Sequence, residues 1–150
     1  SDPELDPNGY RTLMVWQLVE RSRGVPGLAA RLEARAVARN VRPKEADLVG
    51  LLEAGELDYI WSYESMAKAI GFRYVLLGDS VDLSVPELAD VYRAASVSVR
   101  GAVSGSRVTF TGAPIVYAFA VPREAPQPAL AQRFADFLVS TEGKAILRRE

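Results

Sequence analysis

The segment from Val41 to Ser65 constrains the fold of this chain more than any other part of the sequence. It predicts a helix that begins at Pro43 and ends at Gly55, then a short apolar strand over Leu57–Trp61. A turn rich in hydroxyl groups follows and leads into another helix. Such a unit places helix N-termini and hydroxyl groups beyond the end of one strand. Because a helix N-terminus attracts negative charge, the pattern favours the binding of a small anion.

Two absences from the composition exclude many kinds of chemistry. The chain contains no cysteine and no histidine, which removes thiolate catalysis, histidine bases and most zinc sites. A net charge of −1, with 18 basic and 19 acidic residues, leaves no basic surface for nucleic acid. We therefore expect a protein that is not an enzyme and that needs no cofactor. A hydrolase that uses carboxylates such as Asp6, Asp58 or Glu64 is an alternative, although the sequence indicates no catalytic pair.

Predicted strands alternate with predicted helices along much of the chain. The expected strands cover residues 57–61, 73–77, 95–99, 107–111 and 114–121. The expected helices lie between Pro7 and Gly24 and over 26–36, 43–54, 64–70 and 86–94, with a long helix after Pro128 and a short one after Ser140. The third and fourth of these strands, residues 95–99 and 107–111, are expected to pair as a hairpin. This alternation indicates an α/β sandwich with a mainly parallel sheet.

Several motifs occur together in a characteristic order. They are Asp6-Pro7-Asn8-Gly9-Tyr10-Arg11, the run Val41 to Leu48, the run Leu51 to Tyr59, Tyr63-Glu64-Ser65, Pro114-Ile115-Val116-Tyr117 and Phe134 to Leu138 with Glu142-Gly143. This order resembles the molybdate/tungstate-binding component of ABC importers, and is closest to the tungstate-type branch. The resemblance covers nearly the whole chain, and its closing pattern is shared by many extracellular solute-binding proteins.

The resemblance implies a fold and a location. We expect a type II periplasmic-binding-protein-like fold, a three-layer α/β sandwich with a mixed sheet, that lacks the N-terminal part of its first lobe. Residues 1–72 would form most of the second lobe, on the anion-binding side, and residues 73–150 would return to complete the first lobe and end in two helices. The protein would be periplasmic or extracellular, with a lipid anchor on a leader outside this chain.

The resemblance also implies partners. The expected function is capture of a tetrahedral oxyanion, molybdate or tungstate, for an ABC permease in the membrane. The missing N-terminal half of the protein would be a further partner, and self-association of the chain is expected because part of a lobe exposes core surface. Two alternatives stay open: a ligand-sensing regulatory domain of the same fold, and a binder of sulfate or phosphate.

Candidate ligand contacts lie first in the Asp-Pro-Asn-Gly-Tyr motif. Asp6 caps the following helix, and in the tungstate-type branch an acidic residue here can approach the metal atom of the oxyanion. Asn8, Gly9 and Tyr10 could present backbone N–H groups to the anion, with Gly9 allowing a close approach. The alternative is an ordinary Pro-Asn-Gly turn.

The other candidates lie near the starts of the helices expected at residues 43–54 and 64–70. The resemblance makes Val41 and Arg42 backbone donors, while the Arg42 side chain either offsets the anion's charge or forms a surface salt bridge. The resemblance makes Tyr63 a hydroxyl donor to the oxyanion, and Ser65 is a candidate because polar groups cluster in this turn; the alternative for Tyr63 is a core tyrosine at the end of a strand. Glu64 either supplies a second carboxylate for the metal atom or points to solvent, because Ser62 stands where the family pattern can place a carboxylate.

Overall fold

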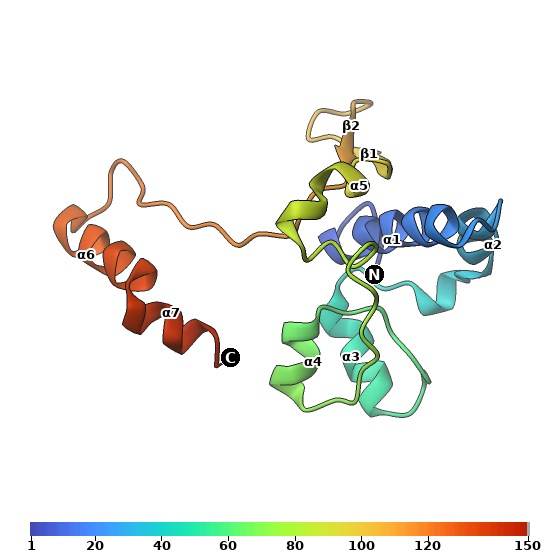
Figure 1. Cartoon of the computed structure of the whole chain (residues 1–150), viewed down its shortest axis with the longest axis horizontal. Helices are drawn as coiled ribbons and strands as arrows, with labels where there is room; N and C mark the ends of the chain where they lie inside the picture. The colour runs from blue at the N-terminus through green and yellow to red at the C-terminus, as the bar shows by residue number, and fades with distance from the viewer. Residues whose placement is uncertain (150) are drawn as a thin grey trace. The chain divides into compact units, whose positions relative to one another are not determined.

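The computed structural model describes residues 1–149 and divides into two compact units. The first unit comprises Ser1–Glu64 and Arg73–Ile115, and the second comprises Ser65–Phe72 and the residues from Val116 onward. Figure 1 labels the helices and strands in chain order. They are α1 (Pro7–Arg23), α2 (Leu28–Arg35), η1 (Ala38–Asn40), α3 (Glu45–Glu53), α4 (Glu64–Ile70), η2 (Pro86–Leu88), α5 (Ala89–Tyr92), β1 (Ser96–Arg100), β2 (Arg107–Thr111), α6 (Pro128–Val139) and α7 (Thr141–Leu147).

Local signals determine where the long helix α1 begins and ends. The Asp6 side chain accepts a hydrogen bond from the Asn8 N–H, and Pro7 occupies the first helical position, where its missing N–H costs nothing. The helix ends at Gly24, whose φ of 61° is in the left-handed region. The predicted helix between Pro7 and Gly24 is therefore confirmed. α2 packs beside it (Figure 1).

One hydrophobic cluster forms the core of the first unit. Its buried members come from α1, from the loop before η2 and from α5 with the residue that precedes β1: Met14, Val15, Leu18, Val81, Leu83, Tyr92 and Ala95. Tyr92 is fully buried, donates its hydroxyl hydrogen to the Asp79 carbonyl and accepts the Val85 N–H at 3.1 Å. A buried phenol is stable there because both of its polar functions are satisfied.

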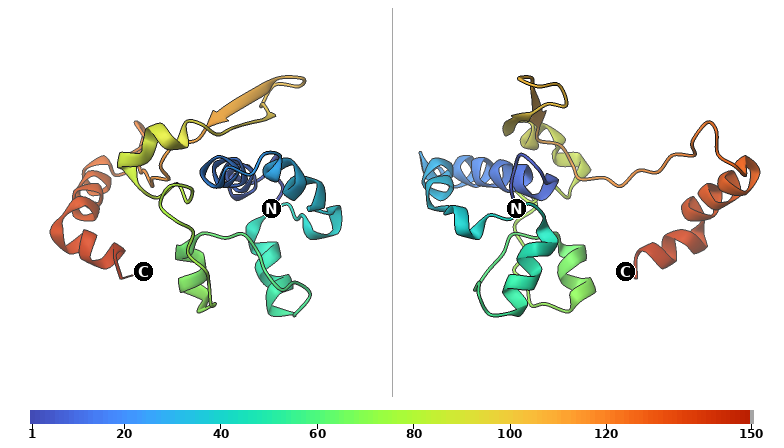
Figure 2. Two further views of the ribbon diagram at one scale, coloured as in Figure 1. Left: turned by 45° about the vertical axis from the view of Figure 1, so that its right-hand side comes forward. Right: turned by 180° about the vertical axis from the view of Figure 1, so that it is seen from behind.

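The predicted hairpin is confirmed. β1 and β2 pair as antiparallel strands, with Ser96 opposite Thr111 and Arg100 opposite Arg107. The turn between them contains Gly105 with a φ of 77°. Figure 2 shows the hairpin from two further sides. Among the described residues, β1 and β2 together form a two-stranded sheet.

The predicted mixed sheet is wrong for the part of the chain that the structure describes. Residues 57–61, 73–77 and 114–121 have no regular strand structure, and Val116 and Tyr117 are 73% and 86% exposed. An apolar run becomes a central strand only where neighbouring strands supply hydrogen bonds on both sides. Residues 1–149 supply no such neighbours. These 149 residues are consequently rich in helix and do not form a three-layer sandwich.

The second unit contains the C-terminal helix pair. α6 and α7 meet at Ser140, whose hydroxyl accepts the Gly143 N–H at 3.1 Å and so caps α7. Large apolar side chains of α6 are accessible, since Leu130 is 50% exposed and Phe134 60%. No helix among residues 1–149 combines the length and the apolar character that a membrane span requires.

Gly112 gives a test of how closely the hairpin packs on α5. A Cβ atom at Gly112 would overlap the carbonyl oxygen of Tyr92, whereas a Cβ at Gly50 in α3 would meet nothing within 4 Å. Gly112→Ala is expected to destabilise the protein by about 1–3 kcal/mol through steric strain. Gly50→Ala, the matched control, should stabilise it by roughly 0.5–1 kcal/mol through helix propensity. Urea denaturation measures both, and equal effects of the two substitutions would contradict this packing.

Candidate anion-binding site

The Asp6 carboxylate joins the N-termini of two helices. Its Oδ1 accepts the Asn8 N–H at 2.9 Å, in the first turn of α1. Its Oδ2 accepts the Glu45 N–H at 2.7 Å, at the first residue of α3. The helix-capping role predicted for Asp6 is confirmed, and a second helix shares the same cap. Both helix N-termini thus direct partial positive charge at one anionic group.

Asn8 attaches the segment before α4 to the start of α1. Its side chain is 4% exposed and donates from Nδ2 to the Trp61 carbonyl at 2.9 Å. The Thr12 hydroxyl donates to the Asn8 carbonyl at 2.8 Å. The polar atoms of Asn8 therefore bond to other parts of the protein, and a ligand contact through this residue stays a prediction.

The N-terminal segment of the protein lies close to the Gly9 backbone. A Cβ at this position would lie 2.6 Å from the Pro3 nitrogen, because residues 1–3 pass directly over the glycine. The Gly9 N–H bonds to the Asp6 carbonyl at 3.0 Å. Packing against the N-terminal segment is thus a sufficient reason for glycine here, and the role of its N–H in anion binding stays a prediction.

Tyr10 and Arg11 form an aromatic and cationic stack. The Tyr10 ring lies 4.7 Å from the ring of Phe110 on β2, nearly parallel to it at 7°. The Arg11 guanidinium carbon lies 5.7 Å from the centre of the Tyr10 ring and 5.6 Å from that of Tyr63. Arg11 Nη1 donates to the Tyr63 hydroxyl at 2.5 Å. Among residues 1–149, Arg11 has no carboxylate partner within salt-bridge distance.

Val41 and Arg42 differ in what their backbone N–H groups bond to. The Val41 N–H donates to the Ala38 carbonyl at 3.2 Å. The Arg42 N–H donates no hydrogen bond within the described part of the chain. The Arg42 side chain donates to the carbonyls of Arg39 and Val41 instead of pairing with a carboxylate. The salt-bridge alternative for Arg42 is therefore not realised among the described residues, and its N–H is the available donor.

Glu45 and Tyr63 connect α3 with the turn before α4. Glu45 is 7% exposed, and its Oε1 accepts the Ser62 hydroxyl at 2.5 Å and the Tyr63 N–H at 3.1 Å. Burial raises the pKa of the Tyr63 hydroxyl above its ordinary value, while the neighbouring Arg11 acts in the opposite direction. Tyr63 is therefore a neutral phenol at physiological pH.

The remaining predicted residues lie at the start of α4. Glu64 accepts the Tyr74 hydroxyl at 3.2 Å. Ser65 is exposed and belongs to the second unit. A role for either in ligand binding stays a prediction.

Arg11 and Glu45 were not predicted from the sequence as members of the site. Both stand inside quoted motifs, Arg11 after Tyr10 and Glu45 two residues after Pro43. Their contacts reach residues 52 and 18 positions away. A signal was present for Glu45 alone, since an acidic residue in the first turn of a helix suits the helix dipole.

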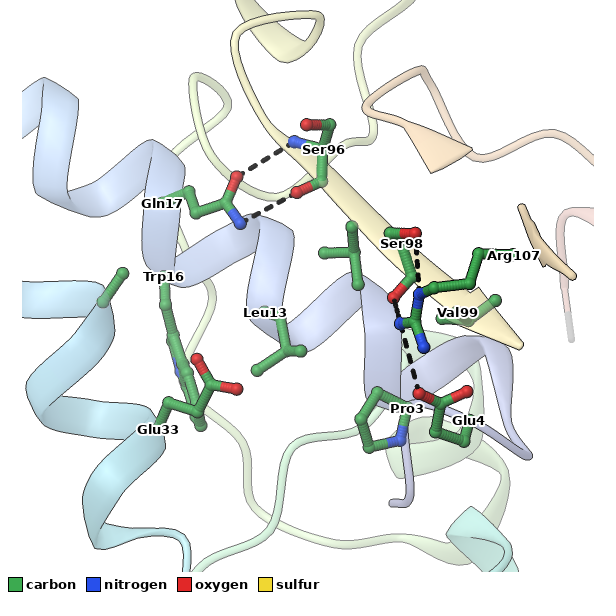
Figure 3. Close-up of a pocket in the computed structure, with 12 residues that line it drawn as sticks. Pro3, Glu4, Leu13, Trp16, Gln17, Glu33, Ser96, Ser98, Val99 and Arg107 are labelled. Carbon is green, nitrogen blue, oxygen red and sulfur yellow. Dashed lines mark hydrogen bonds and ion pairs between the residues drawn. The ribbon is translucent and has the colours of Figure 1, made fainter. Parts of the chain in front are cut away.

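A separate cavity of about 280 Å³ lies against α1, α2 and β1 (Figure 3). The Gln17 side chain forms two hydrogen bonds with the backbone of Ser96 there, and Glu4 accepts from Arg107 at 3.5 Å. The buried indole N–H of Trp16 has no partner among residues 1–149. None of the predicted anion-binding residues lines this cavity. Its polar groups mainly bond to one another, so we place the candidate site at Asp6 instead.

Removing the Asp6 carboxylate should weaken two helix starts together. Asp6→Ala leaves the N–H groups of Asn8 and Glu45 without their acceptor, and we expect a loss of about 1–4 kcal/mol, the sum of two caps. Amide hydrogen exchange should accelerate at both residues. Ser140→Ala, which removes a single cap, should accelerate exchange at Gly143 only. Protection retained at Glu45 in Asp6→Ala would show that the second cap does not exist.

The buried Tyr63 should make stability depend on pH in the alkaline range. The folded state holds the phenol proton more tightly than the unfolded state, whose tyrosine titrates near pH ~10. Above that pH the unfolded state binds fewer protons, so the free energy of unfolding falls as pH rises. Tyr63→Phe should show a smaller decrease in urea denaturation between pH ~9 and ~11. Parallel curves for the two proteins would rule out this linkage.

Comparison with known proteins identifies the family. A model of the family described as bacterial extracellular solute-binding protein matches residues 1–150. An uncharacterised solute-binding protein of Petrotoga mobilis is 43% identical over 147 residues, which covers 98% of this chain and 46% of that protein.

Two archaeal relatives carry a ligand in their names. The molybdate/tungstate-binding protein WtpA of Pyrococcus abyssi is 34% identical, covering 99% of this chain and 47% of that protein. The protein of the same name from Thermococcus kodakarensis is 33% identical, covering 97% and 46%. The chain spans about half the length of these curated relatives. On the family match over its whole length, the chain belongs to the bacterial extracellular solute-binding proteins.

Proposed function

We propose that this chain forms part of a solute-binding protein that captures a tetrahedral metal oxyanion, molybdate or tungstate, for an ABC importer. Two relatives that are 33% and 34% identical bear the name molybdate/tungstate-binding protein. The matching family is described as bacterial extracellular solute-binding protein. Binding, release and transfer of a ligand are therefore the steps that the site has to perform.

The observation that supports the proposal best is the position of Asp6. Two helix N-termini meet at its carboxylate, and the Arg11 guanidinium, which has no carboxylate partner among the described residues, donates to Tyr63 in the adjoining turn. The N–H of Arg42 adds a donor without a recorded acceptor among residues 1–149. Helix N-termini, a guanidinium and a phenol are groups that stabilise a bound dianion.

The charge of Asp6 itself determines which dianion suits the site. A carboxylate repels an approaching sulfate or phosphate, and that repulsion is strong where water is excluded. A molybdate or tungstate ion differs, because its metal atom can accept a carboxylate oxygen as an additional ligand. We propose that Asp6 bonds to the metal atom and that the neighbouring donors contact the oxyanion's oxygens.

The protonation state of the ligand gives further discrimination. Phosphate keeps a proton near neutral pH, whereas molybdate and tungstate are fully deprotonated. A pure donor such as the Arg42 N–H cannot satisfy a ligand O–H group, which needs an acceptor. Rejection of a ligand that leaves a buried polar group unpaired is typically strong.

The family implies a periplasmic-binding-protein-like fold. We propose the type II arrangement, with residues 1–72 in the second lobe and residues 73–150 completing the first. The extended runs 57–61, 73–77 and 114–121 would then pair with strands from a segment equivalent to the half of the relatives that this chain does not cover. The expected partner is a membrane permease, and the expected location is the periplasm or cell exterior, with a lipid anchor outside the chain.

Calorimetry on the full-length protein that carries this chain tests the proposal. Tungstate and molybdate should bind, and sulfate and phosphate should bind far more weakly or not at all. Absence of binding by every oxyanion, or a preference for sulfate, would overturn the assigned function.

A substitution at Asp6 tests the role of the carboxylate. Asp6→Asn keeps the shape and one acceptor oxygen but loses the charge. We expect the affinity for tungstate to fall about tenfold or more, the cost of one charge-assisted contact, while the affinity for sulfate does not fall because the repulsion is also removed. Thermal melting without ligand controls for the lost cap. A decrease by the same factor for both anions would mean that Asp6 serves only the helices.

A further inference from the structure

Hydrogen bonds fix both the backbone and the side chain of Tyr63. Its N–H donates to Glu45 Oε1 at 3.1 Å, and its hydroxyl oxygen accepts from Arg11 Nη1 at 2.5 Å. Glu45 is itself fixed, since it is 7% exposed and its own N–H bonds to Asp6 Oδ2 at 2.7 Å. The phenol therefore has a defined position relative to the Asp6 carboxylate before any ligand arrives.

In the Arg11–Tyr63 hydrogen bond, Arg11 can only be the donor and the Tyr63 hydroxyl oxygen can only be the acceptor. A guanidinium carries donors and no acceptor, so the phenol oxygen must accept. The hydroxyl hydrogen is then free to point elsewhere. Arg11 also contacts two aromatic rings, since its guanidinium carbon lies 5.7 Å from the centre of the Tyr10 ring and 5.6 Å from that of Tyr63, and Tyr10 stacks on Phe110.

We propose that Arg11 is a positioning residue that turns the Tyr63 hydroxyl into a donor-only contact for the bound oxyanion. The inference rests on the proposed function and deepens it by assigning selectivity for deprotonated ligands to this pair. With its acceptor side occupied by Arg11, the hydroxyl donates to an anionic oxygen but accepts poorly from a ligand O–H group. Hydrogen phosphate is then disfavoured, and a fully deprotonated dianion is favoured.

The electrostatics of the pair agree with this role. Burial raises the pKa of Tyr63, so the phenol keeps the proton that it must donate. Arg11 offsets part of this effect and polarises the O–H group, which strengthens its hydrogen bond to an anion. No carboxylate among the described residues lies within salt-bridge distance of Arg11.

A double-mutant cycle on the full-length protein tests the proposal, with Arg11→Met, Tyr63→Phe and the combination. Calorimetry with tungstate and with phosphate gives the ratio of the two affinities for each protein. Arg11→Met should lower the tungstate-to-phosphate ratio about tenfold, the effect of one hydrogen bond to a charged group. In the Tyr63→Phe background, Arg11→Met should leave the ratio unchanged, because no hydroxyl remains to be oriented.

Two control variants separate positioning from a general effect of losing a cation. Arg11→Lys keeps a donor and should retain most of the selectivity. Arg31→Met removes an exposed arginine of α2 that donates only to the Pro26 carbonyl among the described residues, and it should leave the ratio as in the wild type. A ratio that falls equally in Arg31→Met would overturn the assignment to Arg11.

The outcomes distinguish this inference from the proposed function. If the wild type binds no oxyanion, the proposed function fails and the inference fails with it. If the wild type binds tungstate but Arg11→Met weakens tungstate and phosphate by the same factor, only the inference fails. An effect of Arg11→Met on the ratio that persists without the Tyr63 hydroxyl also overturns it.

A ligand-free measurement gives an independent readout. Near-ultraviolet absorbance follows tyrosine ionisation, and Arg11→Met should raise the pKa of one tyrosine because a nearby positive charge is lost. The same substitution in the Tyr63→Phe background should produce no such change. An identical titration in the wild type and in Arg11→Met would show that the guanidinium does not act on the phenol.

Discussion

A single carboxylate connects the parts of this chain that its candidate site requires. Asp6 accepts hydrogen bonds from the first turns of α1 and α3, whose N-termini would otherwise present unsatisfied donors and like partial charges to each other. Two further bonds extend the connection to the turn before α4, from Asn8 to the Trp61 carbonyl and from the Tyr63 N–H to Glu45. Residues 39 and 53 positions apart in the sequence are thereby held together by polar contacts.

In the proposed site, Asp6 would serve both the structure of the protein and its selectivity for the ligand. The helix N-termini stabilise the negative charge of Asp6, and the charge in turn opposes any ordinary anion that approaches it. Under the proposed function, a ligand would compensate for that opposition only if it offered Asp6 an electrophilic atom. Under the same proposal, Arg11 and Tyr63, which form a hydrogen-bonded pair in the adjoining turn, would supply the positive charge and the donor that the ligand's oxygens need. Membership of the solute-binding family and relatives named for molybdate and tungstate fit such a site.

The sequence predicts local features well and long-range ones poorly. Helix ends at Gly24, Gly55 and Gly71 follow from the left-handed backbone that glycine adopts easily. The hairpin over residues 96–111 follows from alternation and a glycine turn. The runs 57–61 and 114–121 read as strands because apolar sequence alone cannot tell whether a partner strand exists.

In the candidate site, too, local features are predictable from the sequence and long-range contacts are not. The cap at Asp6 was predictable because Pro7 follows it directly. The second cap at Glu45 was not, since it depends on a contact 39 residues away. Arg11 was missed for the same reason, because its role comes from the position of Tyr63 and not from any neighbour in sequence.

X-ray absorption at the tungsten edge, on the full-length protein with bound tungstate, tests the central claim most directly. The spectrum reports how many oxygen atoms surround the metal. The account predicts more oxygen neighbours than free tungstate has, and a return to the number of free tungstate in Asp6→Asn. A bound tungstate whose surroundings match those of the free ion in the wild-type protein would contradict it.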